Sequence, residues 1–281
     1  MLLELAIADA YGFGFEYAPS DFVARHNRGE VFVQHPGRPD IIPGRYSDDT
    51  QMSVALAEFM LSGEPMTAVN LVGYFIDAFK RDPREGYAGR FYDILVKVRN
   101  PQDFLSVVQP QSNRSGGAMR ASTCGLLAST DDVINAAVWQ ASVTHATRDG
   151  MNAAAASALL VWACRQGIDQ GFLPQFLNDT VPGYQWDIPW IGPVGAPGIH
   201  AVKAALDALA NETTLHDVLV HSVAFTGDVD TVAAISLAAA SQHPDIVKNL
   251  APELYDGLED GKYGKKYITK LDARLTKRFP I

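Results

Sequence analysis

Two short acidic clusters, far apart in the sequence, hold the side chains best suited to catalytic or metal chemistry. They are Ser47-Asp48-Asp49-Thr50 and Gly227-Asp228-Val229-Asp230-Thr231. Each precedes an apolar pattern of helical period, so each is predicted to lie at the N-terminus of a helix. Capping such a helix needs one side-chain acceptor, and a carboxylate there gains about 0.3–1 kcal/mol from the helix dipole. The surplus of carboxylates and hydroxyls indicates a further role.

Binding of divalent cations is the role that this surplus favours. If the two clusters meet in the fold, four carboxylates and up to three hydroxyls converge. Carboxylates that close repel one another unless they are protonated or bridged by a metal ion. Oxygen ligands without a thiolate or a nearby histidine favour Mg, Mn or Ca over Zn or Cu. Four carboxylates suit two such ions better than one.

Two other classes of acidic motif fit less well. An EF-hand is excluded because Val232 occupies the ligand position after Asp230 and no glycine follows. A phosphatase of the haloacid dehalogenase type is an alternative, since the Asp-Val-Asp-Thr-Val run from Asp228 follows the apolar segment 218–225. In that family the motif lies early in the chain at the end of a strand, with a lysine and an acidic pair downstream. Here it lies late, and only Glu259-Asp260 could supply the pair.

The elements that position these clusters are predicted to be helices. Windows rich in Ala, Leu and Val, with helical period, alternate with short breaks through most of the chain, and strand signals are few. Two proline-rich segments, 35–46 and 182–198, are predicted to be loops, the second suiting either close helix packing or a backbone wall of a ligand cleft. No linker is evident, so we predict one all-α domain over residues 1–281. The clearest helical windows are 50–61, 67–81, 132–145 and 149–167.

Composition and charge narrow the class of protein. The chain has 281 residues, 47% hydrophobic and 20% charged, which is typical of a globular protein, and a net charge of -9. That charge repels nucleic acid and anionic membranes, so non-specific nucleic-acid binding is not expected. Cys124 and Cys164 match no metal or redox spacing and are predicted to be buried thiols of a reducing compartment. Neither a basic signal region nor a membrane-length apolar run is present, so we expect a cytoplasmic location without membrane contact.

Three further stretches accompany the acidic clusters. Near the start stands Ala8-Asp9-Ala10-Tyr11-Gly12-Phe13-Gly14-Phe15-Glu16, then Arg114-Ser115-Gly116-Gly117-Ala118-Met119-Arg120, then the pair Thr144-His145. Together these motifs resemble the ADP-ribosylglycohydrolase family, which includes the dinitrogenase-reductase-activating glycohydrolases and the ADP-ribosyl-acceptor hydrolases. That family opens with Gly-Asp-Ala-x-Gly-x-x-x-Glu, has a substrate loop Gly-Asn-Gly-Gly-Ala-Met-Arg, and ends its signature with Gly-Asp-x-Asp-Thr-x-Ala-Ala. The resemblance runs from residue 8 to about residue 240, with the order of motifs intact.

The resemblance implies a compact orthogonal bundle of α-helices with a binuclear magnesium or manganese centre at the bottom of a cleft for ADP-ribose. Asp230 is implied to bridge the two ions. Ser47 departs from the usual family threonine but keeps a hydroxyl. The implied ligands are Ser47, Asp48 and Asp49 for one ion, and Asp228, Asp230 and Thr231 for the other.

On the substrate side, the resemblance makes Glu16 a mobile acidic residue near the scissile bond. The glycine pair would let backbone N–H groups approach a diphosphate or the distal ribose. A simpler interpretation makes this pair a tight start to a helix, and the histidine a partner of a helix C-terminus. Arg114 and Ser115 depart from the Gly-Asn of the family. The implied substrate-binding residues are Ser115, Gly116, Gly117, Met119 and His145.

The implied reaction is hydrolysis of the bond between an acceptor and the anomeric carbon of the distal ribose, with ADP-ribose as product. The substrate would be an ADP-ribosylated protein or another ADP-ribosylated acceptor. Ions would fix the ribose hydroxyls and orient a water, while Glu16 or Asp48 moves the proton. The alternative is a non-catalytic descendant that binds ADP-ribose without cleaving it, an idea kept open by Ala8, Ser47 and Arg114-Ser115.

Overall fold

The protein is built from helices throughout residues 1–280, the part of the chain that this computed structural model describes. Within that part no strand forms, and a few isolated β-bridges join loops. The prediction of an all-α orthogonal bundle is therefore confirmed. The elements, including two 3₁₀ helices labelled η, are α1 (Leu2–Phe13), α2 (Ser20–His26), α3 (Asp48–Ser62), α4 (Ala68–Arg81), α5 (Gly89–Lys97), α6 (Pro101–Val107), α7 (Gly116–Met119), η1 (Ala121–Leu126), α8 (Thr130–Ser142), α9 (Arg148–Arg165), η2 (Gln170–Phe172), α10 (Leu173–Thr180), α11 (Gly198–Asn211), α12 (Leu215–Ala224), α13 (Val229–Ala240), α14 (Pro252–Gly257) and α15 (Lys265–Arg278).

The four helical windows predicted from the sequence correspond to α3, α4, α8 and α9. Side-chain caps set their first residues: the Ser47 hydroxyl accepts a hydrogen bond from the Asp49 N–H, and the Thr67 hydroxyl accepts from Asn70. Helix α3 thus begins two residues before the predicted window. Helix α8 ends at Ser142, three residues before the predicted end. The existence of each element follows from its apolar period, whereas its ends depend on local hydrogen bonds.

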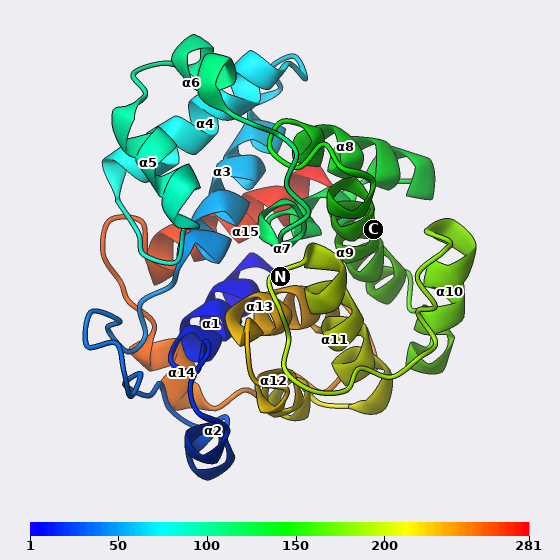
Figure 1. Cartoon of the computed structure of the whole chain (residues 1–281). Coiled ribbons are helices and arrows are strands. Elements are labelled where there is room, and N and C mark those ends of the chain that lie inside the picture. Colours follow the sequence, from blue (N-terminus) through cyan, green and yellow to red (C-terminus); the bar gives the residue numbers. More distant parts are fainter. Residues whose placement is uncertain (281) are drawn as a thin grey trace.

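Helices α1 and α13 lie side by side in the middle of the molecule, with α3 beside α1 and the other helices around them (Figure 1). Gly12 permits this contact, because a Cβ atom there would lie 2.5 Å from the Asp230 Cα atom. The two helices are almost completely buried along their length. Their close packing brings the end of α1 against the beginning of α13.

The two proline-rich segments are loops, as predicted. The second crosses the molecule beside the start of α13, where the Val194 N–H donates to Thr226 O and the Asp228 N–H donates to Val194 O. It also pairs with the segment before α7, since Ser115 N–H donates to the carbonyl oxygen of Ala196. Backbone of this loop therefore connects two of the predicted site segments, which favours its interpretation as a wall beside the site.

Other sequence predictions concern the cysteines and the phosphatase alternative. Cys124 and Cys164 are buried free thiols, as predicted. The apolar segment before Asp228 is helix α12 and not a strand, so the haloacid dehalogenase alternative lacks its strand end and is wrong. Among the described residues, no helix is both long and apolar enough to cross a membrane. The apolar side chains form one continuous core cluster, while the single-domain assignment stays a prediction.

Candidate metal and ADP-ribose site

The first acidic cluster is held in place by a buried carboxylate of α1. Asp9 is fully buried, and its Oδ1 accepts a hydrogen bond from the Ser47 hydroxyl at 2.6 Å. Its Oδ2 accepts from the Ser47 N–H at 3.0 Å, the Thr50 N–H at 3.0 Å and the Thr50 hydroxyl at 2.5 Å. Four donors from one helix N-terminus satisfy this carboxylate, so α1 fixes both the position and the orientation of the α3 tip.

The second acidic cluster is shaped by a glycine in the left-handed region. Gly227 has φ +89°, and a Cβ atom there would lie 2.0 Å from the Val194 carbonyl oxygen. Only glycine fits this turn without displacing the loop. The Gly227 carbonyl accepts from the Tyr17 N–H at 2.8 Å, which anchors the residue after Glu16 beside α13. Asp228 therefore begins α13 next to the end of α1.

The structure brings the two clusters together. Carboxylate oxygens of Glu16, Asp228 and Asp230 lie within 4.8 Å of one another, a group that could hold a metal ion. Burial raises the pKa of Asp49, and the nearby charges of Asp48, Asp9 and Asp228 raise it further. Burial likewise raises the pKa of Asp230, with additional contributions from Glu16 and then Asp49. The carboxylates of α1, α3 and α13 thus share one electrostatic environment.

Two carboxylate oxygens in this environment have no hydrogen-bond partner in the described part of the protein. They are Asp49 Oδ2 and Asp230 Oδ1, both on side chains that are almost fully buried. A buried carboxylate oxygen without a partner is costly, by several kcal/mol where the group stays charged. A hard divalent cation would satisfy both oxygens and offset the mutual repulsion, so the donor set fits such an ion.

Glu16 lies at the edge of the cluster rather than within the helices. Its carboxylate pairs with Arg38 at 3.3 Å, and Arg38 also contacts Asp40. Burial, and next the charge of Asp228, raise the pKa of Glu16 to about 7, although Arg38 acts in the opposite direction. A carboxyl group with this pKa can hold a proton or release it near neutral pH. Sequence reasoning did not single out Arg38, because nothing in its loop relates it to the acidic motif.

The predicted substrate-loop residues lie on the other side of the carboxylates. The Ser115 hydroxyl donates to Asp228 Oδ2 at 3.1 Å, which links this loop directly to the acidic cluster. Gly116 and Gly117 pack against the His145 ring: a Cβ atom would meet its Cε1 at 3.0 Å or its Cγ at 3.2 Å. Close contact with the His145 side chain therefore favours glycine at both positions.

Met119 belongs to the hydrophobic core, with a side chain that is 4% exposed. Its carbonyl oxygen accepts from the Ser53 hydroxyl at 3.3 Å, which ties α7 to α3. Met119 therefore packs in the core, and its contact with substrate stays a prediction. The neighbouring Arg120 is almost fully buried and donates to the Gly116 carbonyl in the same loop.

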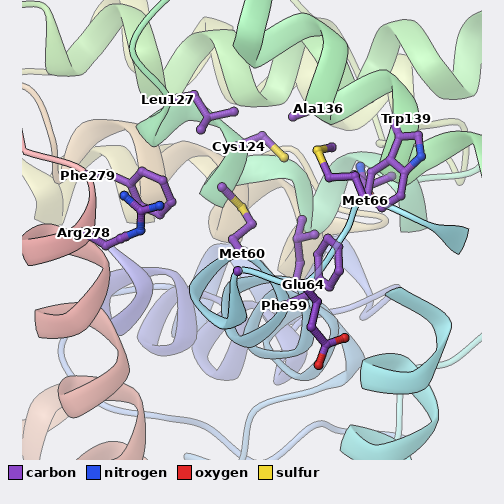
Figure 2. A pocket seen from close by; sticks show the side chains of 13 residues that line it. Phe59, Met60, Glu64, Met66, Cys124, Leu127, Ala136, Trp139, Arg278 and Phe279 are labelled. Atoms are coloured by element: carbon purple, nitrogen blue, oxygen red, sulfur yellow. The ribbon is translucent and has the colours of Figure 1, made fainter. Parts of the chain in front are cut away.

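An apolar pocket with a volume of about 160 Å³ lies elsewhere, between the C-terminal part of α3, α8, η1 and the end of α15 (Figure 2). Phe59, Met60, Met66 and Trp139 form much of its wall. Phe59 is ten residues beyond Asp49 along α3, roughly 15 Å at the rise of an α-helix. Within residues 1–280 no carboxylate cluster lines this pocket, and the acidic cluster lies at the other end of α3.

A family model described as ADP-ribosylglycohydrolase matches residues 1–279. The chain belongs to the ADP-ribosylglycohydrolase family. This assignment agrees with the resemblance inferred from the short motifs, and it covers parts of the chain that those motifs do not reach.

Individual relatives support the same family. The proteins named ADP-ribosylhydrolase ARH3 from Mus musculus and Homo sapiens are 34% identical to this chain over 143 residues, covering 47% of this chain and 39% of theirs. The Danio rerio protein of that name is 29% identical over 199 residues, covering 63% of this chain and 51% of the relative. The match thus spans between 39% and 51% of the length of these relatives, which is less than two thirds.

A solved structure described as an ADP-ribosylglycohydrolase-related protein complex has a TM-score of 0.76 to this chain. The superposition covers 98% of this chain and 95% of that one, at 22% sequence identity. At that identity the similarity supports the fold of the family.

Asp9 stands within the first motif, but that motif gave it no role beside the acidic clusters. The signal was present, because Asp9 lies in the middle of the otherwise apolar second half of α1, where a carboxylate must be buried with partners. Gly86 is a further residue of the site: it has φ +102°, and a Cβ atom there would lie 2.1 Å from Asp48 Oδ1. No motif marks Gly86, since its role depends on how the loop before α5 folds over Asp48.

Proposed function

We propose that this protein is a metal-dependent hydrolase that removes ADP-ribose from a modified acceptor by cleaving the bond to the anomeric carbon of the distal ribose. The observation that carries the proposal is a pair of carboxylate oxygens without a hydrogen-bond partner among residues 1–280, Asp49 Oδ2 and Asp230 Oδ1, in a cluster shared by α1, α3 and α13. Such a cluster in a member of this family is best explained by bound divalent cations.

The proposed cofactor is a pair of Mg or Mn ions. Ser47, Asp48 and Asp49 would hold one ion, and Asp228, Asp230 and Thr231 would hold the other. Ser47 suits this role because its proton is directed at Asp9, which leaves an oxygen lone pair for a cation. Thr231 is buried at the first turn of α13, with its hydroxyl 3.5 Å from Asp228 Oδ1.

When bound, the ions would act as Lewis acids that fix the ribose hydroxyls and lower the pKa of a coordinated water. The carboxyl groups of Glu16 and Asp48 are the proposed proton carriers. Burial raises the pKa of Asp48 well above its usual value, and Asp9, Glu16 and Asp228 add to this effect. Glu16, with a pKa of about 7, is able to accept a proton from the attacking water or return one to the leaving group.

The segment 115–117 and the loop around Val194 are proposed to hold the rest of ADP-ribose. Glycine backbone at 116 and 117 allows close approach of the diphosphate, and His145 offers a ring nitrogen beside Gly116. Because the net charge of the chain is -9, attraction of an anionic ligand would depend on these local groups and on bound cations.

The test uses an Asp228→Asn/Asp230→Asn double variant, assayed with an ADP-ribosylated protein and added Mg or Mn. Release of ADP-ribose should fall to background in this variant, and should fall in the unaltered protein when a chelator is present. The matched control is Asp131→Asn/Asp132→Asn, which alters two exposed carboxylates at the start of α8 and should retain full turnover.

Several outcomes separate the proposal from its alternatives. Unchanged turnover in the double variant or with chelator would exclude the metal mechanism. Calorimetric binding of ADP-ribose, without cleavage of arginine-, serine- or nucleic-acid-linked substrates, would indicate a non-catalytic binding protein. Cleavage of one of these linkages would identify the acceptor, and comparison of Mg with Mn would identify the effective ion.

A further inference from the structure

A buried chain of hydrogen bonds leads from Arg120 to the ring of His145. The Arg120 Nη2 donates to the Thr144 hydroxyl at 2.8 Å, and that hydroxyl lies 2.7 Å from His145 Nδ1. Arg120 is 1% exposed and Thr144 is 4% exposed, so water does not compete for these bonds. The chain ends at an imidazole whose other nitrogen, Nε2, forms no hydrogen bond within residues 1–280.

The direction of each bond follows from the chemistry of its members. A guanidinium only donates, so Thr144 accepts from Arg120. The hydroxyl then has one proton of its own, and His145 Nδ1 is the one acceptor within the described residues that lies at hydrogen-bond distance. If Nδ1 carried a proton instead, the buried Thr144 hydroxyl would have no acceptor for its own proton, which is costly. The satisfied arrangement therefore leaves Nδ1 unprotonated and places the ring proton on Nε2.

Arg120 cannot turn away to release this arrangement. Its Nε donates to Gln140 Oε1 at 2.6 Å and its Nη1 donates to the Gly116 carbonyl at 2.8 Å. Gln140 in turn donates to the Gly117 carbonyl at 2.9 Å, and the Arg120 guanidinium lies 4.7 Å from the Phe75 ring centroid. Every guanidinium nitrogen is thus engaged, and the same network fixes the loop that faces the acidic cluster.

The imidazole is neutral under ordinary conditions. Burial and the positive charge of Arg120 lower the pKa of His145 to about 3, so the ring has a single proton to place. Gly116 lies against the Nε2 side of the ring, where a Cβ atom would be 3.2 Å from Nε2. Because glycine has no side chain, none covers Nε2 on the side of Gly116, the residue after Ser115, which contacts Asp228.

We propose that Thr144, oriented by Arg120, is a positioning residue that keeps His145 in the tautomer with its proton on Nε2. The ring then presents a hydrogen-bond donor to an oxygen of the anionic ligand, such as a diphosphate or ribose oxygen, and cannot accept from a ligand N–H group. This role in ligand recognition rests on the proposed function, whereas the tautomer itself does not.

The tautomer can be observed directly by two-bond proton–nitrogen correlation spectra of the ¹⁵N-labelled full chain, with His145 assigned by His145→Gln. We expect a pyridine-like Nδ1 and a pyrrole-like Nε2 in the unaltered protein. Thr144→Val should give averaged nitrogen shifts, because Nδ1 loses its donor, and Thr144→Ser should restore the original shifts. Thr123→Val is the matched control, since Thr123 is equally buried and its hydroxyl has no partner in the described residues.

Affinity for ADP-ribose, measured by calorimetry at constant metal content, tests the consequence for binding. Thr144→Val should weaken binding roughly two- to fivefold, because only the fraction of molecules that keep the proton on Nε2 would bind the ligand fully. Thr144→Ser and Thr123→Val should bind with unchanged affinity. A protonated Nδ1 in the unaltered protein, or unchanged shifts in Thr144→Val, would overturn the proposal. If ADP-ribose does not bind at all, the proposed function fails, and the spectra still decide the tautomer.

Discussion

The Ser47 hydroxyl donates its proton to Asp9 across 2.6 Å, and the Ser47 oxygen also accepts from the Asp49 N–H at 3.2 Å. Both partners are fully or almost fully buried, so the direction of the hydroxyl is fixed by the fold. One lone pair of Ser47 therefore remains available on the side of the acidic cluster. Asp9 acts on the site without belonging to the group of carboxylates that would hold the ions.

Asp9→Asn tests this relationship. The amide NH₂ would face either the Ser47 hydroxyl, whose proton then loses its acceptor, or the donors on the other oxygen, so a buried group is left unsatisfied and we expect a loss of about 1–3 kcal/mol in the free energy of unfolding. Urea denaturation measures that loss, and calorimetry with Mg or Mn should show weakened binding because the α3 tip is no longer held. Asp77→Asn, on an exposed side chain of α4, is the control and should change neither quantity. Unaltered metal affinity in Asp9→Asn would exclude the positioning role.

The sequence was sufficient to predict the helices and the identity of the acidic clusters, because apolar period and surplus carboxylates are local properties. It was insufficient for Arg38, Gly86 and Arg120, whose roles depend on contacts between distant segments. The motif around Gly116 led to an expectation of ligand contact, but it did not reveal that His145 packs on the same glycine. The observed ends of helices also differ from the predicted ends, since caps such as Ser47 depend on particular hydrogen bonds.

Gly12→Ala tests whether close packing of α1 on α13 positions the site. The added Cβ would lie 2.5 Å from Asp230 Cα and 2.8 Å from its backbone nitrogen, so the two helices must separate. We expect a loss of about 1–3 kcal/mol, typical of overpacking in a core, together with weaker metal binding. Gly73→Ala is the matched control within α4: only Pro101 Cγ lies nearby, at 3.8 Å, and higher helix propensity should stabilise it by about 0.5–1 kcal/mol. Equal stability of the two variants would contradict the packing argument.

Glu16→Gln tests the proposed proton carrier. The substitution keeps the size of the side chain but removes the group that titrates near neutral pH. Single-turnover release of ADP-ribose should fall by about 10²- to 10⁴-fold, the usual contribution of general acid–base catalysis, with metal content unchanged. Glu30→Gln, which alters an exposed side chain in the loop after α2, is the control and should keep the rate of the unaltered protein. Equal rates in the two variants would assign Glu16 to the surface rather than to the reaction.

The stability of the metal-free protein should depend on pH in a direction set by the raised carboxyl pKa values. For Glu16 the unfolded value is 4.5 and the folded value is about 7, so its stabilising contribution is fully present below pH 4.5 and is lost as pH rises through 7. Glu16 alone accounts for up to roughly 3 kcal/mol over that range, and the raised pKa values of Asp49 and Asp230 act in the same direction. His145 has the opposite sign, because its lowered pKa costs stability below about pH 6.5.

The melting temperature of the chelator-treated protein should therefore fall between pH 6.5 and pH 8, and added Mg or Mn should raise it more at pH 8. The Asp228→Asn/Asp230→Asn variant should lose the effect of added metal and keep a smaller pH effect, because burial still raises the pKa values of Glu16 and Asp49. Equal melting temperatures of the metal-free protein at the two pH values would show that these carboxyl groups do not have raised pKa values in the folded state.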